Sequence, residues 1–166
     1  MAERQIVLLV EDSKDEVSLI CRAFDKAGIL NPLHVAKDGE AALSYLAGVG
    51  QYAHRDEYPL PALVLLDLRL PGMDGFDVLR WIRQQPGFNN LCVVVLTCSD
   101  NIRDVNVAYE LGANSFLVKE VDFENTVELV RLIKDYWLVR ARMAETSRPA
   151  ALPASPGNQA PAKNGR

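Results

Sequence analysis

The chain has 166 residues, which suits one domain with a tail, and 49% of them are hydrophobic, so one buried core is expected. Its formal net charge of -4 argues against nucleic acid as the main partner, because DNA-binding domains usually present a basic face. Three scattered cysteines without a CxxC pair fit a reducing cytoplasm, and no apolar run approaches the roughly 20 residues of a membrane span.

Five short apolar runs recur along the chain, each followed by polar residues. Ile6–Val10, Ala62–Leu66 and Cys92–Leu96 are almost continuously apolar, which is typical of strands buried on both faces of a sheet. Leu33–Ala36 and Ser115–Val118 are the two remaining candidate strands. We therefore expect five short strands.

A helical pattern follows each run. Ser13 and Glu16 form a candidate capping box, and Gly28 gives a stop signal for the first helix. An aspartate precedes each later helical pattern, at Asp38, Asp74, Asp100 and Asp122. Strand and helix thus alternate five times, which predicts an α/β fold with a doubly wound parallel sheet and helices on both faces.

Two stretches interrupt this alternation. Gly48–Pro61 is a long polar link, which we expect to be an exposed excursion and a possible partner surface. The end of the chain is rich in Ala, Pro, Asn and Gly, so residues 144–166 are expected to form a disordered tail. One domain is predicted over residues 1–143, with its core at about 5–138.

Reactive polar groups follow four of the five candidate strands, at Glu11, Asp12, Asp67, Thr97 and Lys119. Because open parallel sheets bind ligands beyond the carboxyl ends of their strands, these side chains should converge on one rim. Three converging carboxylates would repel one another without a cation, and hard oxygen ligands suit Mg²⁺. A carboxylate can also act as a nucleophile toward phosphorus.

Four ordered motifs carry a family resemblance: Val-Glu-Asp-Ser at 10–13, Leu-Leu-Asp-Leu-Arg-Leu-Pro-Gly-Met-Asp-Gly at 65–75, Leu-Thr at 96–97, and Leu-Gly-Ala-Asn-Ser-Phe-Leu-Val-Lys at 111–119. Together they resemble the receiver domain of bacterial response regulators, over about Gln5 to Trp137. The resemblance implies a flavodoxin-like sheet with strand order 2-1-3-4-5. It also implies a single-domain response regulator of two-component signal transduction, without an enzymatic activity of its own.

The resemblance assigns a metal site and a phosphoacceptor. Asp67 matches the residue that takes a phosphoryl group from a histidine kinase. Glu11 and Asp12 match the acidic pair that holds Mg²⁺ with Asp67, and the main-chain carbonyl of Arg69 would complete the metal site. No nucleic acid or membrane partner is implied.

The resemblance also assigns the residues that respond to phosphorylation. Thr97 matches a hydroxyl switch, Phe116 an aromatic switch, and Lys119 a lysine that pairs with the phosphoryl group. Pro71 and Gly75 match the loop after the acceptor. The output would be a downstream protein or a phosphotransfer partner.

Three features separate this chain from the general pattern. Receivers usually have proline after the lysine, in a cis peptide, whereas this chain has Glu120, so either that peptide is held cis or the loop runs differently. Arg69 stands where many receivers have asparagine. The long link after the second helix and Tyr-Trp-Leu at 136–138 are similar to stand-alone regulators paired with phytochrome-type histidine kinases.

The last helix carries two apolar stripes. Val127, Val130, Ile133 and Trp137 form one, and Leu129, Leu132, Tyr136 and Val139 form the other. One stripe suffices for a helix that packs on a sheet, so the second suggests a homodimer contact, with broader core coverage as the alternative.

Two other classes of function stay open from the residues. One is an aspartyl-nucleophile phosphohydrolase, although Arg69 occupies the place where a second carboxylate would act as general acid. The other is a protein-binding module that works without phosphorylation, which Glu120 leaves possible and the full acidic set argues against.

Overall fold

The computed structural model of the protein describes residues 4–142, 144, 146 and 147. Its centre is one five-stranded sheet, made of β1 (Val7–Val10), β2 (Leu33–Ala36), β3 (Leu63–Leu66), β4 (Cys92–Thr97) and β5 (Ser115–Val118). All neighbouring strands pair in parallel, in the order β2-β1-β3-β4-β5. The predicted strands, fold class and strand order are thus confirmed. β1, β3 and β4 are buried along their whole length, as their continuous apolar runs predicted.

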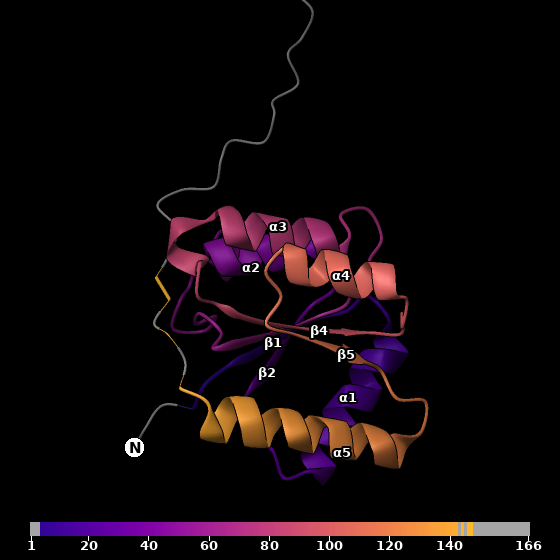
Figure 1. Ribbon diagram of the computed structural model, residues 1–166. Helices are drawn as coiled ribbons and strands as arrows, with labels where there is room; N and C mark the ends of the chain where they lie inside the picture. The colour runs from indigo at the N-terminus through magenta and orange to yellow at the C-terminus, as the bar shows by residue number, and fades with distance from the viewer. Residues whose placement is uncertain (1–3, 143, 145, 148–166) are drawn as a thin grey trace, which may run out of the picture.

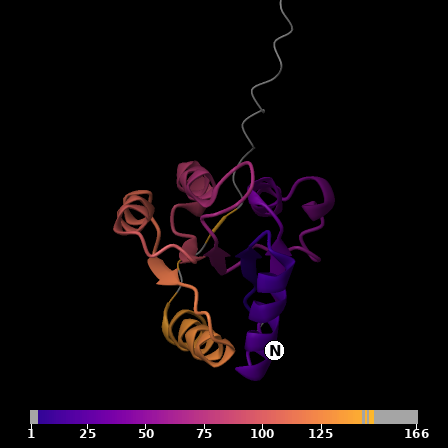
Figure 2. The same cartoon turned by 90° about the vertical axis from the view of Figure 1, so that its right-hand side faces the viewer.

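Helices cover both faces of the sheet. They are α1 (Lys14–Lys26), α2 (Gly39–Ala47), α3 (Gly75–Gln84), α4 (Ile102–Glu110) and α5 (Phe123–Ile133), with 3₁₀ turns η1 (Gly50–Tyr52) and η2 (Pro86–Phe88) and a π-helical segment η3 (Lys134–Arg140). α2, α3 and α4 lie on one face, and α1 and α5 lie on the other (Figures 1 and 2). Each face of the sheet therefore has its own hydrophobic core.

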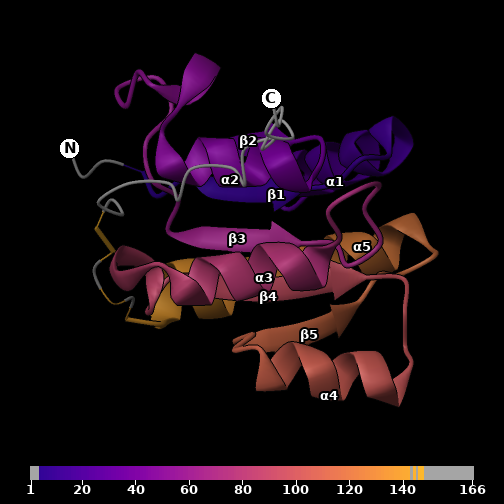
Figure 3. The same cartoon turned by 90° about the horizontal axis from the view of Figure 1, so that it is seen from above.

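The two cores meet only through the sheet, because successive side chains of a strand point to opposite faces. In β1, Leu8 and Val10 pack in the core under α2 and α3, while Val7 and Leu9 pack in the core under α1 and α5. The strands run in one direction, so their carboxyl ends form a single rim (Figure 3). The sequence pattern thereby positions the residues that follow each strand.

Helix caps fix where the helices begin. Asp38, Asp74 and Asp122 accept hydrogen bonds from the backbone of the first turn of their helices, as the aspartates before these patterns suggested. Asn101, rather than Asp100, caps α4. The aspartate that precedes this helix in the sequence lies one residue too early to be its cap.

The predicted capping box of α1 is only half formed. The N–H of Glu16 donates to the Ser13 hydroxyl at 3.3 Å. The N–H of Ser13, however, donates to the Glu11 carboxylate at 3.0 Å, and the Glu16 carboxylate pairs with Lys119. The second half of this prediction is wrong, because a buried ammonium competes for the glutamate.

The link between α2 and β3 is exposed at residues 53–54 and 56–57, as predicted, but it packs against the domain at Tyr52. Tyr52 is buried, and its ring packs on that of Tyr45 with centroids 5.2 Å apart. The guanidinium of Arg55 donates to the carbonyls of Tyr45 and Leu46, near the end of α2. These two contacts fasten an otherwise exposed link to the end of this helix.

Ser147, the last residue that the structure describes, lies against η2. The N–H of Ser147 donates to the carbonyl of Gly87 in η2 at 3.0 Å. The rest of the predicted tail lies outside the described residues, apart from residues 144 and 146. Among the helices that the structure describes, none has the length and apolar content to cross a membrane.

Candidate phosphoryl and metal site

Three carboxylates meet at the rim formed by the strand ends. Glu11 and Asp12 follow β1, and Asp67 follows β3, the strand beside it. Their side chains each offer an oxygen such that all three atoms lie within 4.8 Å of one another. Glu11 and Asp67 are buried, whereas Asp12 is exposed. The predicted convergence is therefore confirmed, and the set has one open side.

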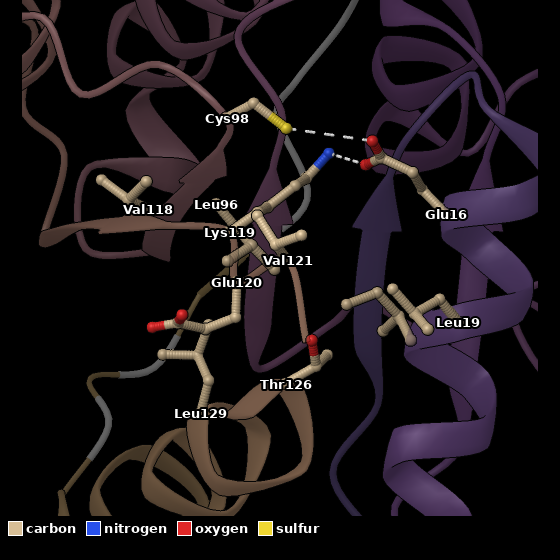
Figure 4. A pocket seen from close by; sticks show the side chains of 11 residues that line it. Glu16, Leu19, Leu96, Cys98, Val118, Lys119, Glu120, Val121, Thr126 and Leu129 are labelled. Atoms are coloured by element: carbon tan, nitrogen blue, oxygen red, sulfur yellow. Dashed lines mark hydrogen bonds and ion pairs between the residues drawn. The ribbon is translucent and has the colours of Figure 1, made fainter. Parts of the chain in front are cut away.

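Lys119, at the end of β5, balances this negative charge. Its Nζ donates to Asp67 Oδ2 at 3.1 Å and to Glu11 Oε2 at 2.5 Å. It also pairs with Glu16 on α1, and Figure 4 shows the two side chains reaching toward each other from β5 and α1. One ammonium thus joins three carboxylates from separate parts of the chain.

Burial and pairing shift the pKa values of this cluster. Burial raises the pKa of Glu11 to about 7, although hydrogen bonds from Lys119 and Ser13 partly oppose it. Burial by itself would lower the pKa of Lys119, but its hydrogen bonds to Glu11 and Glu16 and the nearby charge of Asp67 raise that pKa above its usual value. Lys119 therefore stays a cation that can compensate charge at Asp67.

The peptide after Lys119 is trans, since the described residues contain no cis peptide bond. Of the two possibilities left open by the Glu120 substitution, the loop therefore runs differently. The lysine still reaches Asp67. The following residues turn outward, and the side chain of Val121 is fully exposed.

The loop after β3 wraps closely around Asp67. The N–H of Arg69 donates to Asp67 Oδ1 at 3.1 Å, which places the backbone of Arg69 against the acceptor carboxylate. Gly75 begins α3, and a Cβ at this position would lie 2.6 Å from the Cα of Leu68 and even closer to the carbonyl oxygen of Asp67. Glycine is therefore required for the loop to return so near to its strand.

Thr97 and Phe116 stand on the two strands beyond Asp67. Thr97 is buried at the end of β4, where its Oγ1 accepts the N–H of Ser99 at 3.5 Å and its carbonyl accepts the N–H of Lys119 at 2.8 Å. Phe116 is half-buried and packs against the core under α2, α3 and α4. The rim thus brings together the carboxylates and Lys119, with Thr97 on the adjoining strand end.

Two residues that bond to the site were not predicted from the sequence. Glu16 was interpreted as a cap, although its place in the first turn of a helix that begins at the rim was a usable signal. Asp104 on α4 accepts hydrogen bonds from the guanidinium of Arg69 at 2.8 Å and from the hydroxyl of Ser99 at 2.5 Å. No motif in the sequence pointed to Asp104.

Two depressions flank the cluster. An open one of about 460 Å³ is lined by Glu11, Asp12, Lys37 and Pro71 among others, so it gives access to the acidic pair. A second, of about 440 Å³, lies between α1, β5 and α5, with Lys119 and Glu16 toward one end and Leu129 toward the other (Figure 4).

The response regulator receiver domain family matches residues 7–131. This chain belongs to that family. Its relatives include the response regulator Rcp1 of Synechocystis, which is 39% identical over 134 residues covering 81% of this chain and 89% of Rcp1. The probable methanogenesis regulatory protein FilR2 of Methanothrix harundinacea is 42% identical over 136 residues, covering 80% of this chain and 83% of FilR2.

Solved receiver structures agree with this fold. The phosphorylated cyanobacterial phytochrome response regulator RcpA has a TM-score of 0.78 and 33% identity, covering 85% of this receiver and 99% of RcpA. The Mn²⁺-bound form of Rcp1 has a TM-score of 0.75 and 37% identity, covering 84% and 99%. The predicted resemblance to phytochrome response regulators is confirmed, and the receiver's acidic pocket is a divalent-metal site of the kind this family has.

Proposed function

We propose that Asp67 is the phosphoacceptor of this response regulator and that Thr97, Phe116 and Lys119 respond to its phosphorylation. One observation carries the proposal: the buried carboxylate of Asp67 lies beside two other carboxylates and 3.1 Å from the ammonium of Lys119, whose side chain is 10% exposed. The cluster places several negative charges next to one fixed cation, the Lys119 ammonium. That arrangement suits a site at which a phosphoryl group arrives and must be neutralised.

The chemistry is a transfer between two nucleophiles. A carboxylate oxygen of Asp67 attacks the phosphorus of a kinase phosphohistidine, a P–O bond forms, the P–N bond breaks, and the imidazole leaves. Lys119 is placed to pair with a phosphoryl oxygen. The N–H of Arg69 holds the other oxygen of the Asp67 carboxylate, which orients the attacking one.

Mg²⁺ is the metal that this donor set would hold. Carboxylate oxygens from Glu11, Asp12 and Asp67 are hard ligands, and the exposed side at Asp12 leaves room for the waters that Mg²⁺ keeps. The main-chain carbonyl of Arg69 is our candidate for a further ligand. When bound, the ion would neutralise charge on the phosphoryl oxygens during transfer.

Phosphorylation would reorganise the groups around Asp67. The new charge draws the Thr97 hydroxyl toward a phosphoryl oxygen and strengthens the pairing with Lys119. Phe116, half-buried next to the core, then turns further inward. The face formed by α4, β5 and α5 changes, and a downstream protein or a phosphotransfer partner reads the change.

The kinase partner is proposed to be a phytochrome-type histidine kinase. RcpA is described as a phytochrome response regulator, and the long link after α2 and the Tyr-Trp-Leu ending suggested the same kind of partner. Nucleic acid is not proposed as a partner, in view of the net charge of -4. A cytoplasmic location fits the three free thiols.

The protein is proposed to act as a switch rather than as an enzyme. A phosphohydrolase would need a free general acid near Asp67, but position 69 holds an arginine that pairs with Asp104, and both oxygens of the Glu11 carboxylate are bonded, to Lys119 and to the N–H of Ser13. A binding module independent of phosphate would have no use for a buried cluster of carboxylates around an ammonium. Phosphorylation-dependent signalling is therefore the better supported function.

A phosphotransfer assay tests this proposal. An autophosphorylated phytochrome-type histidine kinase should pass its phosphoryl group to this protein in the presence of Mg²⁺, and Asp67→Asn should abolish the transfer. Asp100→Asn, which changes an exposed carboxylate on the same rim, should leave it intact. Equal labelling of the Asp67→Asn protein would refute the assignment, and steady turnover of phosphate esters would restore the phosphohydrolase hypothesis.

We also propose a homodimer that uses α5 and η3. Leu132, Tyr136 and Val139 are exposed, with 66%, 60% and 62% of their surface accessible. The first stripe is buried at Val127, Val130 and Ile133, and broader core coverage accounts for Leu129 in the second stripe but not for its three exposed members. Leu132 and Tyr136 also border a shallow depression with Leu117 and Trp137. This apolar surface supports a self-association contact.

A further inference from the structure

The two loops that flank Asp67 are tied together by one carboxylate on α4. Asp104 Oδ2 accepts a hydrogen bond from Arg69, two residues after Asp67, and another from Ser99, two residues after Thr97. The first helical turn of α4, which contains Asp104, is thus fixed to both sides of the candidate phosphoryl site. We infer that Asp104 is a positioning residue that competes with the phosphoryl group for the Arg69 guanidinium and so couples α4 to phosphorylation of Asp67.

The backbone of Arg69 contacts the acceptor carboxylate, but its side chain points away from that carboxylate. Its N–H donates to Asp67 Oδ1 at 3.1 Å, whereas its guanidinium lies 2.8 Å from Asp104. The side chain is 67% exposed, so rotation of its torsions meets solvent rather than packed atoms. One arginine is therefore within reach of two anionic positions.

The balance between these positions changes when Asp67 is phosphorylated. The present ion pair is screened by water at its Arg69 end, where the side chain is mostly exposed, so the pair holds the guanidinium only weakly. A phosphoryl group carries close to two negative charges and three acceptor oxygens, and arginine binds it with two parallel hydrogen bonds. The guanidinium should therefore leave Asp104 for the phosphoryl group.

When the Arg69 guanidinium leaves Asp104, α4 loses one of the two hydrogen bonds that hold its first turn. Asp104 is 17% exposed at its side chain and keeps the Ser99 hydroxyl as a partner, but it loses its cation. The carboxylate then sits close to a new negative charge, and repulsion favours a shift of the first turn of α4. Asp104 and the phosphoryl group thus compete for the guanidinium, so a change that weakens its bond to one strengthens its bond to the other.

This inference rests on the proposed role of Asp67, and a double-mutant cycle tests it. The probe is beryllofluoride with Mg²⁺, which mimics the phosphoryl group on a carboxylate. Asp104→Asn should tighten beryllofluoride binding on the order of fivefold when Arg69 is present, because the guanidinium is released. In the Arg69→Gln background the same change should have a clearly smaller effect, because only the repulsion by Asp104 is removed, and Asp100→Asn should change nothing in either background.

A second readout is the backbone amide spectrum of α4. Beryllofluoride should move the amide signals of residues 101–105 in the unmodified protein, and Arg69→Gln should reduce that movement. Arg69→Lys, which keeps the charge without the planar fork, should restore part of it. An equal effect of Asp104→Asn in both backgrounds, or unchanged α4 shifts in Arg69→Gln, would overturn the inference. Failure of the unmodified protein to bind beryllofluoride would instead refute the proposed function.

Discussion

At the scale of single residues, the site depends on an excess of carboxylates around one ammonium. Glu11, Glu16 and Asp67 all bond to the Nζ of Lys119, which is 10% exposed at its side chain. A buried cation with three acidic partners is held firmly, since removing it would leave uncompensated charges out of water. Lys119 is therefore both a structural counter-charge and a candidate ligand for the phosphoryl group.

These two roles predict that removal of Lys119 changes the affinities for Mg²⁺ and for beryllofluoride in opposite directions. In Lys119→Met the carboxylates lose their internal cation, so Mg²⁺ should bind about 5- to 10-fold more tightly, equivalent to roughly 1 kcal/mol. Beryllofluoride should bind more weakly, because its charge-assisted partner is gone. Titration calorimetry with each ligand measures both constants.

Lys37→Met is the matched control, because it removes an exposed lysine from the same rim. It should alter Mg²⁺ affinity less than Lys119→Met does. Equal effects of the two substitutions would show that Lys119 acts only through the general charge of the rim.

The sequence could predict which residues meet at the rim, but not all of the bonds between them. Asp67, Glu11 and Lys119 follow apolar runs, and the geometry of a parallel sheet brings strand ends together. The partners on helices, Glu16 and Asp104, depend on how far each helix is rotated and how long each side chain is. Those are properties of packing, which a pattern of apolar spacing does not specify.

At the scale of elements, a single arginine joins α3 to its neighbours on the chain. The Arg83 guanidinium donates to the carbonyls of Gly112, Phe88 and Leu91 at 2.8–3.0 Å, and to the side chain of Asn114 at 3.0 Å. It thereby fixes the turn before β5 and the segment before β4. A charged group that satisfies several carbonyls at once contributes more than an exposed ion pair.

Arg83→Met should therefore lower the free energy of unfolding by about 2–4 kcal/mol, because several part-buried carbonyls lose their donor. Urea unfolding followed by tryptophan fluorescence measures this loss. Arg80→Met on the same helix removes only an exposed pair with Asp77 and should cost less than about 0.5 kcal/mol. Similar losses in the two proteins would contradict this role for Arg83.

The strand elements were predictable because their apolar runs are continuous or nearly so, whereas the contacts that fasten the link between α2 and β3 to the helix were not. Tyr52 and Arg55 look like polar loop residues in the sequence. In the fold, the ring of Tyr52 packs on Tyr45, and Arg55 satisfies carbonyls at the end of α2. Aromatic and guanidinium groups have both apolar and polar parts, so composition does not reveal whether a loop packs or projects.

At the scale of the whole molecule, the receiver presents an apolar surface on α5 and η3 that the fold itself does not cover. If this surface forms a homodimer, Leu132→Glu and Tyr136→Glu should each produce a monomer in sedimentation velocity. Val121→Glu places the same charge at a fully exposed valine outside α5 and should leave the dimer intact. A protein that sediments as a monomer at high concentration, with and without beryllofluoride, would rule out the dimer.

The central claim is that Asp67 accepts a phosphoryl group with the help of Mg²⁺. The most direct measurement is mass spectrometry of the intact protein and its peptides after incubation with acetyl phosphate, with and without Mg²⁺. We predict one added phosphoryl group, carried by the peptide that contains Asp67, formed only with Mg²⁺ and absent from Asp67→Asn. A phosphoryl group on another peptide, or equal labelling of Asp67→Asn, would contradict the claim.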